Sequence, residues 1–328
     1  MALFSRVFQV HKSTESLLQR REVIVGLAGL GATVLGAAVG ASVRGLDDKK
    51  TQFLITADGR RLCFAEWGRA DGVPVFVLHG SPGSRLGVAA ETEAVVTDLG
   101  GRLITYDRPG YGQSDGRGPA TRVVDHVEDV RAIADRLGID GFSITGNSGG
   151  APHALAVAAR LPDRVVRVSN TGAIAPLDLM GLDEWQRNQD SDTREYTAAV
   201  RASQAACAAL FERLDAEMRA ALADDDPMRS AKLEQTRQGV AAWVNDERAL
   251  EFPWGFSVSE IRAPTVIYAN PNDTVTPPNH AEWLVAHIQS AVLVTSANAP
   301  GHAKIDDTSR AWRAVYAWLI KGGEPITP

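Results

Sequence analysis

The sequence has few cysteines and no cluster of metal-binding residues. Only Cys63 and Cys207 occur among 328 residues, and no CxxC motif or Cys/His cluster is present. This spacing disfavours both a disulfide framework and a zinc site. We expect two free, buried thiols, because a free cysteine usually packs as a small apolar side chain.

The sequence also lacks a basic stripe. The formal net charge is −6, and the lysines and arginines are scattered along the chain. No electrostatic footprint for nucleic acid is present, so we predict no nucleic-acid partner. The hydrophobic fraction of 45% and the charged fraction of 23% are close to globular averages. Neither a disordered chain nor a polytopic membrane protein is indicated.

One stretch near the N-terminus lacks charge altogether. Residues 23–43 (VIVGLAGLGATVLGAAVGASV) are long enough to span a bilayer as a helix. An arginine pair precedes them and small residues follow, a pattern that resembles a secretory signal of the twin-arginine kind. An uncleaved single-pass anchor, with a GxxxG face for helix pairing, is the competing interpretation. A buried core helix is disfavoured by the length of the run.

We therefore interpret residues 1–47 as a signal or membrane-anchor segment and exclude them from the fold argument. Membrane contact is predicted through residues 23–43. The protein is expected to be exported or anchored by its N-terminus rather than cytoplasmic.

The rest of the chain, residues 48–328, alternates short strands and helices. Residues 51–68 read as two strands joined by Asp58-Gly59, a strong hairpin signal. Six brief β-branched runs without clean alternation follow, as is typical of strands buried on both faces. These runs are residues 74–80, 102–107, 142–147, 165–170, 265–270 and 291–296.

Amphipathic stretches separate these strands and predict a mostly parallel α/β sheet flanked by helices. They lie at residues 84–99, 120–137, 150–160, 279–289 and 308–320. The segment of about residues 175–256 has helical runs and no strand candidate, so we interpret it as a helical insertion between two strands.

The sequence GNSGG at residues 146–150 follows a predicted strand and precedes a predicted helix. A serine at the centre of GxSxG there must adopt a strained turn, which presents its hydroxyl above the sheet as a nucleophile. Glycines two residues to either side remove side chains that would collide in the turn. The spelling alone is a weak signal, and the strand-to-helix context strengthens it.

Two loops support Ser148 as the nucleophile. The HGSPG motif at residues 79–83 follows a predicted strand, where the backbone N–H of Ser81 can join that of Gly149 in an oxyanion hole. We expect His79 to hold this loop rather than to act as an acid or base. The sequence DRPGYGQSD at residues 107–115 is interpreted as a scaffolding loop beside the site.

These motifs together resemble the α/β-hydrolase superfamily over residues 51–321, in the branch of uncharacterised bacterial esterase-like and proline-iminopeptidase-like members with a serine nucleophile. The family orders its triad as nucleophile, acid and histidine. The resemblance implies Asp273, after a late strand, as the acid and His302, after the last strand, as the base. Asp178 is the competing acid, and Asp273 alone would also fit a turn-forming role.

The function implied is acyl transfer on a carboxylic ester or a related small acyl substrate, without metal or cofactor. Serine in the elbow disfavours epoxide hydrolysis and dehalogenation, which use an aspartate nucleophile in this superfamily. A proline-iminopeptidase-like aminopeptidase is an alternative, because HGSPG is similar to its HGGPG motif. That activity needs acidic groups, of which the insertion carries several: Glu184, Glu195, Glu212 and Asp215.

Two further questions stay open. A catalytically silent binding protein on the same fold is an alternative from another class. Aromatic residues in or near the insertion line an apolar substrate pocket or form its internal core. They are Trp185, Trp243, Phe252, Trp254 and Phe256.

The two interpretations of the N-terminus differ in the mass of the mature protein. Cleavage after the apolar run removes the segment, whereas an anchor leaves the chain intact. In both cases we expect residues 23–43 to direct the chain to a membrane. Mass spectrometry of protein purified from the producing cell measures the difference, and a full-length mass rules out cleavage.

Overall fold

The computed structural model describes residues 50–119, 121–295, 302 and 309–324. The predicted signal or anchor segment therefore lies outside the described residues. No helix in the described part of the chain is both long and apolar enough to cross a bilayer.

The body of the molecule is an eight-stranded sheet in the order β1-β2-β4-β3-β5-β6-β7-β8. The strand β2 is antiparallel to β1 and β4, and all other neighbours are parallel. Gly59 lies in the β1–β2 turn at φ 84°, a conformation that glycine adopts without steric cost. The strands are β1 (Thr51–Ile55), β2 (Arg61–Gly68), β3 (Val73–Leu78), β4 (Gly101–Tyr106), β5 (Phe142–Asn147), β6 (Val165–Thr171), β7 (Thr265–Ala269) and β8 (Ala291–Thr295).

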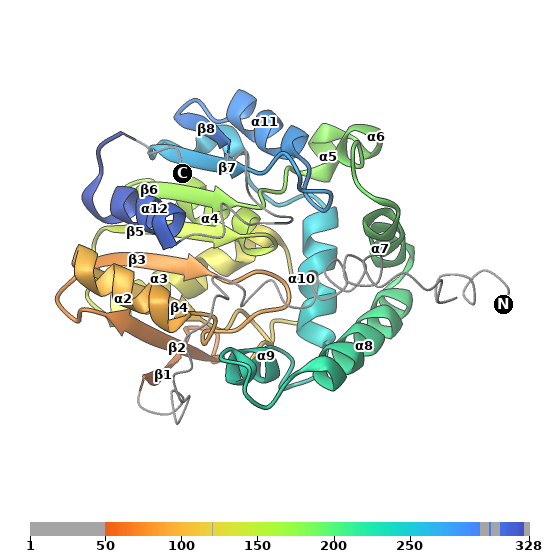
Figure 1. Cartoon of the computed structure of the whole chain (residues 1–328), viewed down its shortest axis with the longest axis horizontal. Coiled ribbons are helices and arrows are strands. Elements are labelled where there is room, and N and C mark those ends of the chain that lie inside the picture. The colour runs from red at the N-terminus through yellow and green to blue at the C-terminus, as the bar shows by residue number, and fades with distance from the viewer. Residues whose placement is uncertain (1–49, 120, 296–301, 303–308, 325–328) are drawn as a thin grey trace, which may run out of the picture.

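Helices cover both faces of this sheet (Figure 1). One hydrophobic core lies under α2 (Ala90–Leu99) and α12 (Ser309–Lys321). The other lies under α3, α4 and α11. The bounds on this second face are η1 (Val123–His126), α3 (Val127–Arg136), α4 (Gly150–Arg160) and α11 (Pro278–His287).

Six helices lie between β6 and β7 and form a cap beside the carboxyl ends of the parallel strands (Figure 1). The cap has a small core of its own, in which the Phe211 and Trp243 rings stack with centroids 4.1 Å apart. The helices are α5 (Leu177–Met180), α6 (Leu182–Trp185), α7 (Ser191–Ala202), α8 (Gln204–Ala221), α9 (Arg229–Gln235) and α10 (Ala241–Glu251), followed by η2 (Val258–Glu260).

Cys63 and Cys207 are free and buried, as predicted. The aromatic residues in or near the insertion lie in several different parts of the structure. Trp243 belongs to the cap core, and Trp254 packs in the main core with Phe256 against it. Phe252 is 51% exposed.

Two predicted elements differ from the structure. The helix expected over residues 84–99 begins only at Ala90. Arg85 explains this, because its backbone N–H and guanidinium both bind the Asp107 carboxylate, at 2.7 Å each, which holds the segment in a loop. The run at residues 291–296 was expected to be buried on both faces, but β8 is an edge strand in which Val292 is 46% exposed.

Candidate active site

The turn between β5 and α4 presents Ser148. Its φ of 50° lies in the left-handed region, which costs a non-glycine residue about 1–2 kcal/mol. Two backbone hydrogen bonds hold the turn: the Ser148 N–H donates to the Thr171 carbonyl at 2.9 Å, and the Ala151 N–H donates to the Ser148 carbonyl at 2.8 Å. A Cβ atom on Gly150 would clash with the Leu78 carbonyl, so only glycine lets α4 start this close to β3.

The structure brings the three residues predicted for the triad together. The Ser148 Oγ lies 2.9 Å from His302 Nε2, and His302 Nδ1 lies 2.8 Å from Asp273 Oδ2. Because Nδ1 faces a carboxylate, it carries the ring proton, and Nε2 is left as an acceptor for the Ser148 hydroxyl. His302 and Asp273 are buried, whereas Ser148 is half-buried.

Asp273 is both a turn-forming residue and the partner of the histidine. Its Oδ1 accepts from the backbone N–H groups of Val275 and Thr276, at 2.9 Å each. These bonds fix the carboxylate while it faces His302. The competing acid, Asp178, lies exposed in the first turn of α5, and no bond to His302 is found for it.

Ser81 and Gly149, the predicted oxyanion-hole residues, are buried and adjacent. A Cβ atom on Gly149 would overlap the Ser81 hydroxyl, which shows how closely the two loops approach. Among the described residues, neither backbone N–H donates a hydrogen bond to another protein group. A buried N–H without a partner is rare, and a pair of them beside a nucleophile suits an oxyanion.

His79 is a neutral member of the loop that carries Ser81. Its Nδ1 donates to the Gly80 carbonyl at 2.7 Å, and its Nε2 accepts from the Arg108 N–H at 3.2 Å. Burial and the nearby Arg108 guanidinium hold the pKa of His79 well below its usual value of 6.5. With both nitrogens bound to backbone, the ring holds the loop in place.

The strained turn at Ser148, the His302–Asp273 pair and a mostly parallel sheet thus occur together in one molecule. A family model described as the alpha/beta hydrolase fold matches residues 73–308. The chain belongs to the α/β-hydrolase family. The predicted fold class is therefore confirmed.

Two relatives with named activities match shorter segments of this α/β-hydrolase. This chain is 29% identical over 126 residues to a bifunctional esterase/perhydrolase of Acinetobacter calcoaceticus. The aligned segment covers 38% of this chain and 45% of that protein. This chain is also 31% identical over 115 residues to a proline iminopeptidase of Neisseria gonorrhoeae. That segment covers 34% of this chain and 36% of the relative. The matches span less than half the length of these relatives.

Among solved structures, a hydrolase from Pseudomonas aeruginosa PA01 has the same fold, with a TM-score of 0.60 and 22% identity. The match covers 84% of this chain and 100% of that one.

A small cavity of about 40 Å³ opens beside Ser148, between the sheet and the cap of this α/β-hydrolase. Trp185 is the single member of the five predicted aromatics that lines it. The other lining residues are mostly polar: Ser81, Ser148, Ile174, Gln189, Thr193, Tyr196, Thr197, Glu247, Glu251, Val275, Thr276 and His302.

Two glutamates of α10, one helical turn apart, face this cavity. Burial, with the neighbouring carboxylates of Asp246 and Glu251, raises the pKa of Glu247 to about 8. Burial also raises the pKa of Glu251 to about 7, against the opposing charge of Arg201 at 3.2 Å. Sequence reasoning missed both residues, because acidic residues on a helix normally indicate a solvated face.

The acidic residues that the sequence suggested lie elsewhere. Glu195 and Glu212 are exposed. Glu184 and Asp215 form ion pairs with Arg187 and Arg219 of their own helical segments. None of the four lines the cavity.

A buried cluster of His126, His153 and Asp246 has ligand atoms within 4.8 Å of one another, a spacing that suits a metal ion. However, the guanidinium of Arg108 forms an ion pair with the same Asp246 carboxylate. A fixed positive charge at this point opposes a second cation. We therefore interpret the cluster as a buried polar contact, in which His153 bonds to Asp246 and the His126 ring packs against His153.

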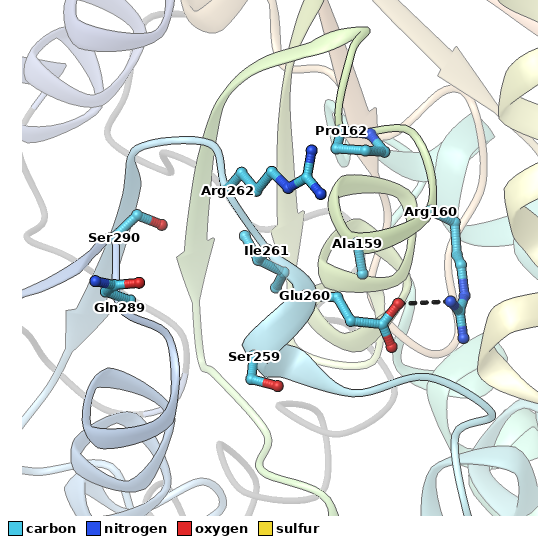
Figure 2. A pocket seen from close by; sticks show the side chains of 9 residues that line it. All are labelled: Ala159, Arg160, Pro162, Ser259, Glu260, Ile261, Arg262, Gln289 and Ser290. Carbon is cyan, nitrogen blue, oxygen red and sulfur yellow. Dashed lines mark hydrogen bonds and ion pairs between the residues drawn. The ribbon is translucent and has the colours of Figure 1, made fainter.

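A surface hollow of about 740 Å³ lies near the amino ends of β6, β7 and β8 (Figure 2). It is formed by the end of α4, η2 and the residues before β7 and β8, and Arg160 pairs with Glu260 in it at 2.6 Å. Its Ser290 hydroxyl donates to the Ala263 carbonyl, and no histidine lines it. This hollow therefore lacks the groups for nucleophilic chemistry.

The raised pKa of Glu247 predicts a pH-dependent gain in stability for Glu247→Gln. Between the ordinary value of 4.5 and about 8, the unfolded chain releases the proton while the folded chain keeps it. The free energy of unfolding therefore falls as pH rises through this window, and the penalty is complete above pH 8. We expect Glu247→Gln to raise the melting temperature more at pH 9 than at pH 5.

Thermal unfolding at the two pH values measures this effect. Glu128→Gln, which alters an exposed side chain of α3, is the matched control. An equal shift at both pH values would contradict the raised pKa of Glu247.

Proposed function

We propose that this α/β-hydrolase is a serine hydrolase that transfers the acyl group of a carboxylic ester, or of a related small acyl substrate, to water. The observation that carries the proposal is the hydrogen-bonded line from Ser148 through His302 to Asp273. An esterase among the similar proteins supports the choice of an ester. A catalytically silent binding protein is disfavoured, because all three positions hold competent side chains in bonding distance.

The first half of the reaction acylates the enzyme. His302 Nε2 takes the hydroxyl proton as Ser148 Oγ bonds to the substrate carbonyl carbon. The carbonyl oxygen becomes an oxyanion, which the N–H groups of Ser81 and Gly149 stabilise. When the bond to the leaving alkoxide breaks, His302 returns the proton to it.

The second half releases the acid. Water loses a proton to His302 as it attacks the acyl-enzyme, and the tetrahedral intermediate collapses with return of that proton to Ser148. Asp273 holds the ring in the useful tautomer and stabilises its charge in both halves. Each step is complete with the residues named and water.

Replacement of Ser148 by alanine tests the nucleophile. We expect Ser148→Ala to lower kcat for a p-nitrophenyl ester by ~10⁴-fold or more and to abolish labelling by a fluorophosphonate probe, since among the described residues no other hydroxyl bonds to His302 Nε2. The control is Ser143→Ala, also on β5, whose hydroxyl binds the Leu319 carbonyl away from the cavity. Unlabelled wild-type protein, or a variant that keeps its activity, would refute the proposal.

An aminopeptidase of the proline-releasing type is a second candidate, supported by Glu247 and Glu251. Both carboxyls face the cavity next to Ser148, and burial raises the pKa of each, although Glu251 also pairs with Arg201. A substrate ammonium group would compensate their negative charge. A proline iminopeptidase among the similar proteins agrees with this candidate.

The two candidates differ in how they depend on these glutamates. For the aminopeptidase, we expect the double variant Glu247→Gln, Glu251→Gln to lower the kcat/KM for L-prolyl p-nitroanilide about tenfold relative to that for a p-nitrophenyl ester, a difference of ~1.4 kcal/mol. Glu195→Gln, on the exposed face of α7, is the control. Wild-type protein that cleaves esters but no prolyl amide would eliminate the aminopeptidase.

A further inference from the structure

Asp246 is a buried carboxylate of cap helix α10 that reaches the loop carrying the proposed oxyanion donor. It is 4% exposed. Its Oδ2 accepts hydrogen bonds from the Ser81 hydroxyl and from the Arg108 guanidinium. The cap is therefore joined to the HGSPG loop by a charged side chain rather than by apolar packing alone.

Arg108 forms a second arm between Asp246 and the same loop. Its guanidinium is fully buried and donates to the carbonyls of His79 and Gly80. It also donates to the Ser81 hydroxyl at 3.0 Å. Three consecutive residues of the loop are thus held by one guanidinium, and Asp246 holds that guanidinium.

The remaining bonds of Asp246 fix its own position. The Tyr111 hydroxyl donates to Oδ2 at 3.1 Å, and His153 Nε2 lies 2.9 Å from Oδ1. Four side chains from three separate parts of the body therefore converge on one carboxylate. The positive charge of Arg108 keeps the pKa of Asp246 well below its usual value, against the penalty of burial.

Ser81 lines the cavity beside Ser148, its hydroxyl binds Asp246, and its side chain and backbone nitrogen lie against Gly149. An oxyanion hole works only if its donors are aimed before charge develops, because reorienting them during the reaction costs free energy. A rotation of the Ser81 peptide would remove one of the two N–H groups of the oxyanion hole. The bonds of the Ser81 hydroxyl oppose that rotation.

We propose that Asp246 is a positioning residue, which holds Ser81 and Arg108 so that the Ser81 N–H is aimed at the oxyanion of the acyl-transfer reaction. The proposal rests on the serine-hydrolase function proposed above. It makes docking of the cap a condition for a complete oxyanion hole. Asp246 itself does not line the cavity, so it acts through the loop rather than on the substrate.

The test compares Asp246→Asn with Ser81→Ala, which keeps the backbone N–H but removes the hydroxyl bonds to Asp246 and Arg108. We expect Asp246→Asn to lower kcat about 10- to 100-fold. Removal of a whole oxyanion-hole donor lowers kcat about 10²–10³-fold, and a misaimed donor should cost no more than that. KM should change less than twofold. Ser81→Ala should lower kcat in the same direction, and it covers the case in which Asp246→Asn does not fold.

A trifluoromethyl ketone inhibitor separates a positioning role from a structural one. Its adduct with Ser148 carries an oxyanion, so its inhibition constant should rise by the same factor as kcat/KM falls in each variant. The double variant Ser81→Ala, Asp246→Asn should lose less activity than the product of the two single losses, because both changes act through the bonds of the Ser81 hydroxyl. Asp129→Asn is the control: Asp129 is a buried aspartate of α3 paired with Arg60 and Arg117, and we expect a lower melting temperature with kcat unchanged.

The possible failures are distinct. Wild-type protein that resists the fluorophosphonate probe overturns the proposed function. The role of Asp246 is overturned if the wild-type protein reacts with the probe but the folded variants keep wild-type kcat. It is also overturned if the variants lose affinity for substrate and inhibitor equally. Additive losses in the double variant would also contradict it.

Discussion

The backbone of Ser148 is the constraint on which the rest of the site depends. A left-handed residue between β5 and α4 is unfavourable, and the hydrogen bonds to Thr171 and Ala151 must sustain it. The same turn brings α4 close to β3, places Gly149 against Ser81 and aims the serine hydroxyl at His302. A relaxed turn would separate all these groups at once.

The second constraint is electrostatic. Arg108 and Asp246 are both withdrawn from water, and charges so placed are tolerated only when paired and hydrogen-bonded. Their partners come from the cap helix α10, the HGSPG loop, the loop after β4 and helix α4. The cost of burying these charges is offset only in the assembled arrangement, so the ion pair specifies how the cap meets the body.

Much of the fold was predictable from local patterns, because buried parallel strands and the hairpin at Gly59 leave strong signals. The three residues predicted for the triad were equally accessible from the sequence, since each follows a strand in the order that the resemblance implies. Glu247, Glu251 and Asp246 were not. They lie in one charged run of an insertion whose helices carry many charges, and only the packing of α10 against the body decides which of these side chains point inward. Likewise, the late start of α2 depends on a bond between Arg85 and Asp107, residues that are distant in sequence.

The cap has a small hydrophobic core of its own, which Tyr111 of the body joins, while Leu250 of α10 packs in the main core. Such a module looks interchangeable, and exchange of caps between relatives would be a natural route to new substrate ranges. In this molecule the exchange has a condition. A graft that replaces α10 and lacks Asp246 leaves the buried guanidinium of Arg108 without a counter-charge. The transferable unit therefore ends before α10 or must include an equivalent of Asp246.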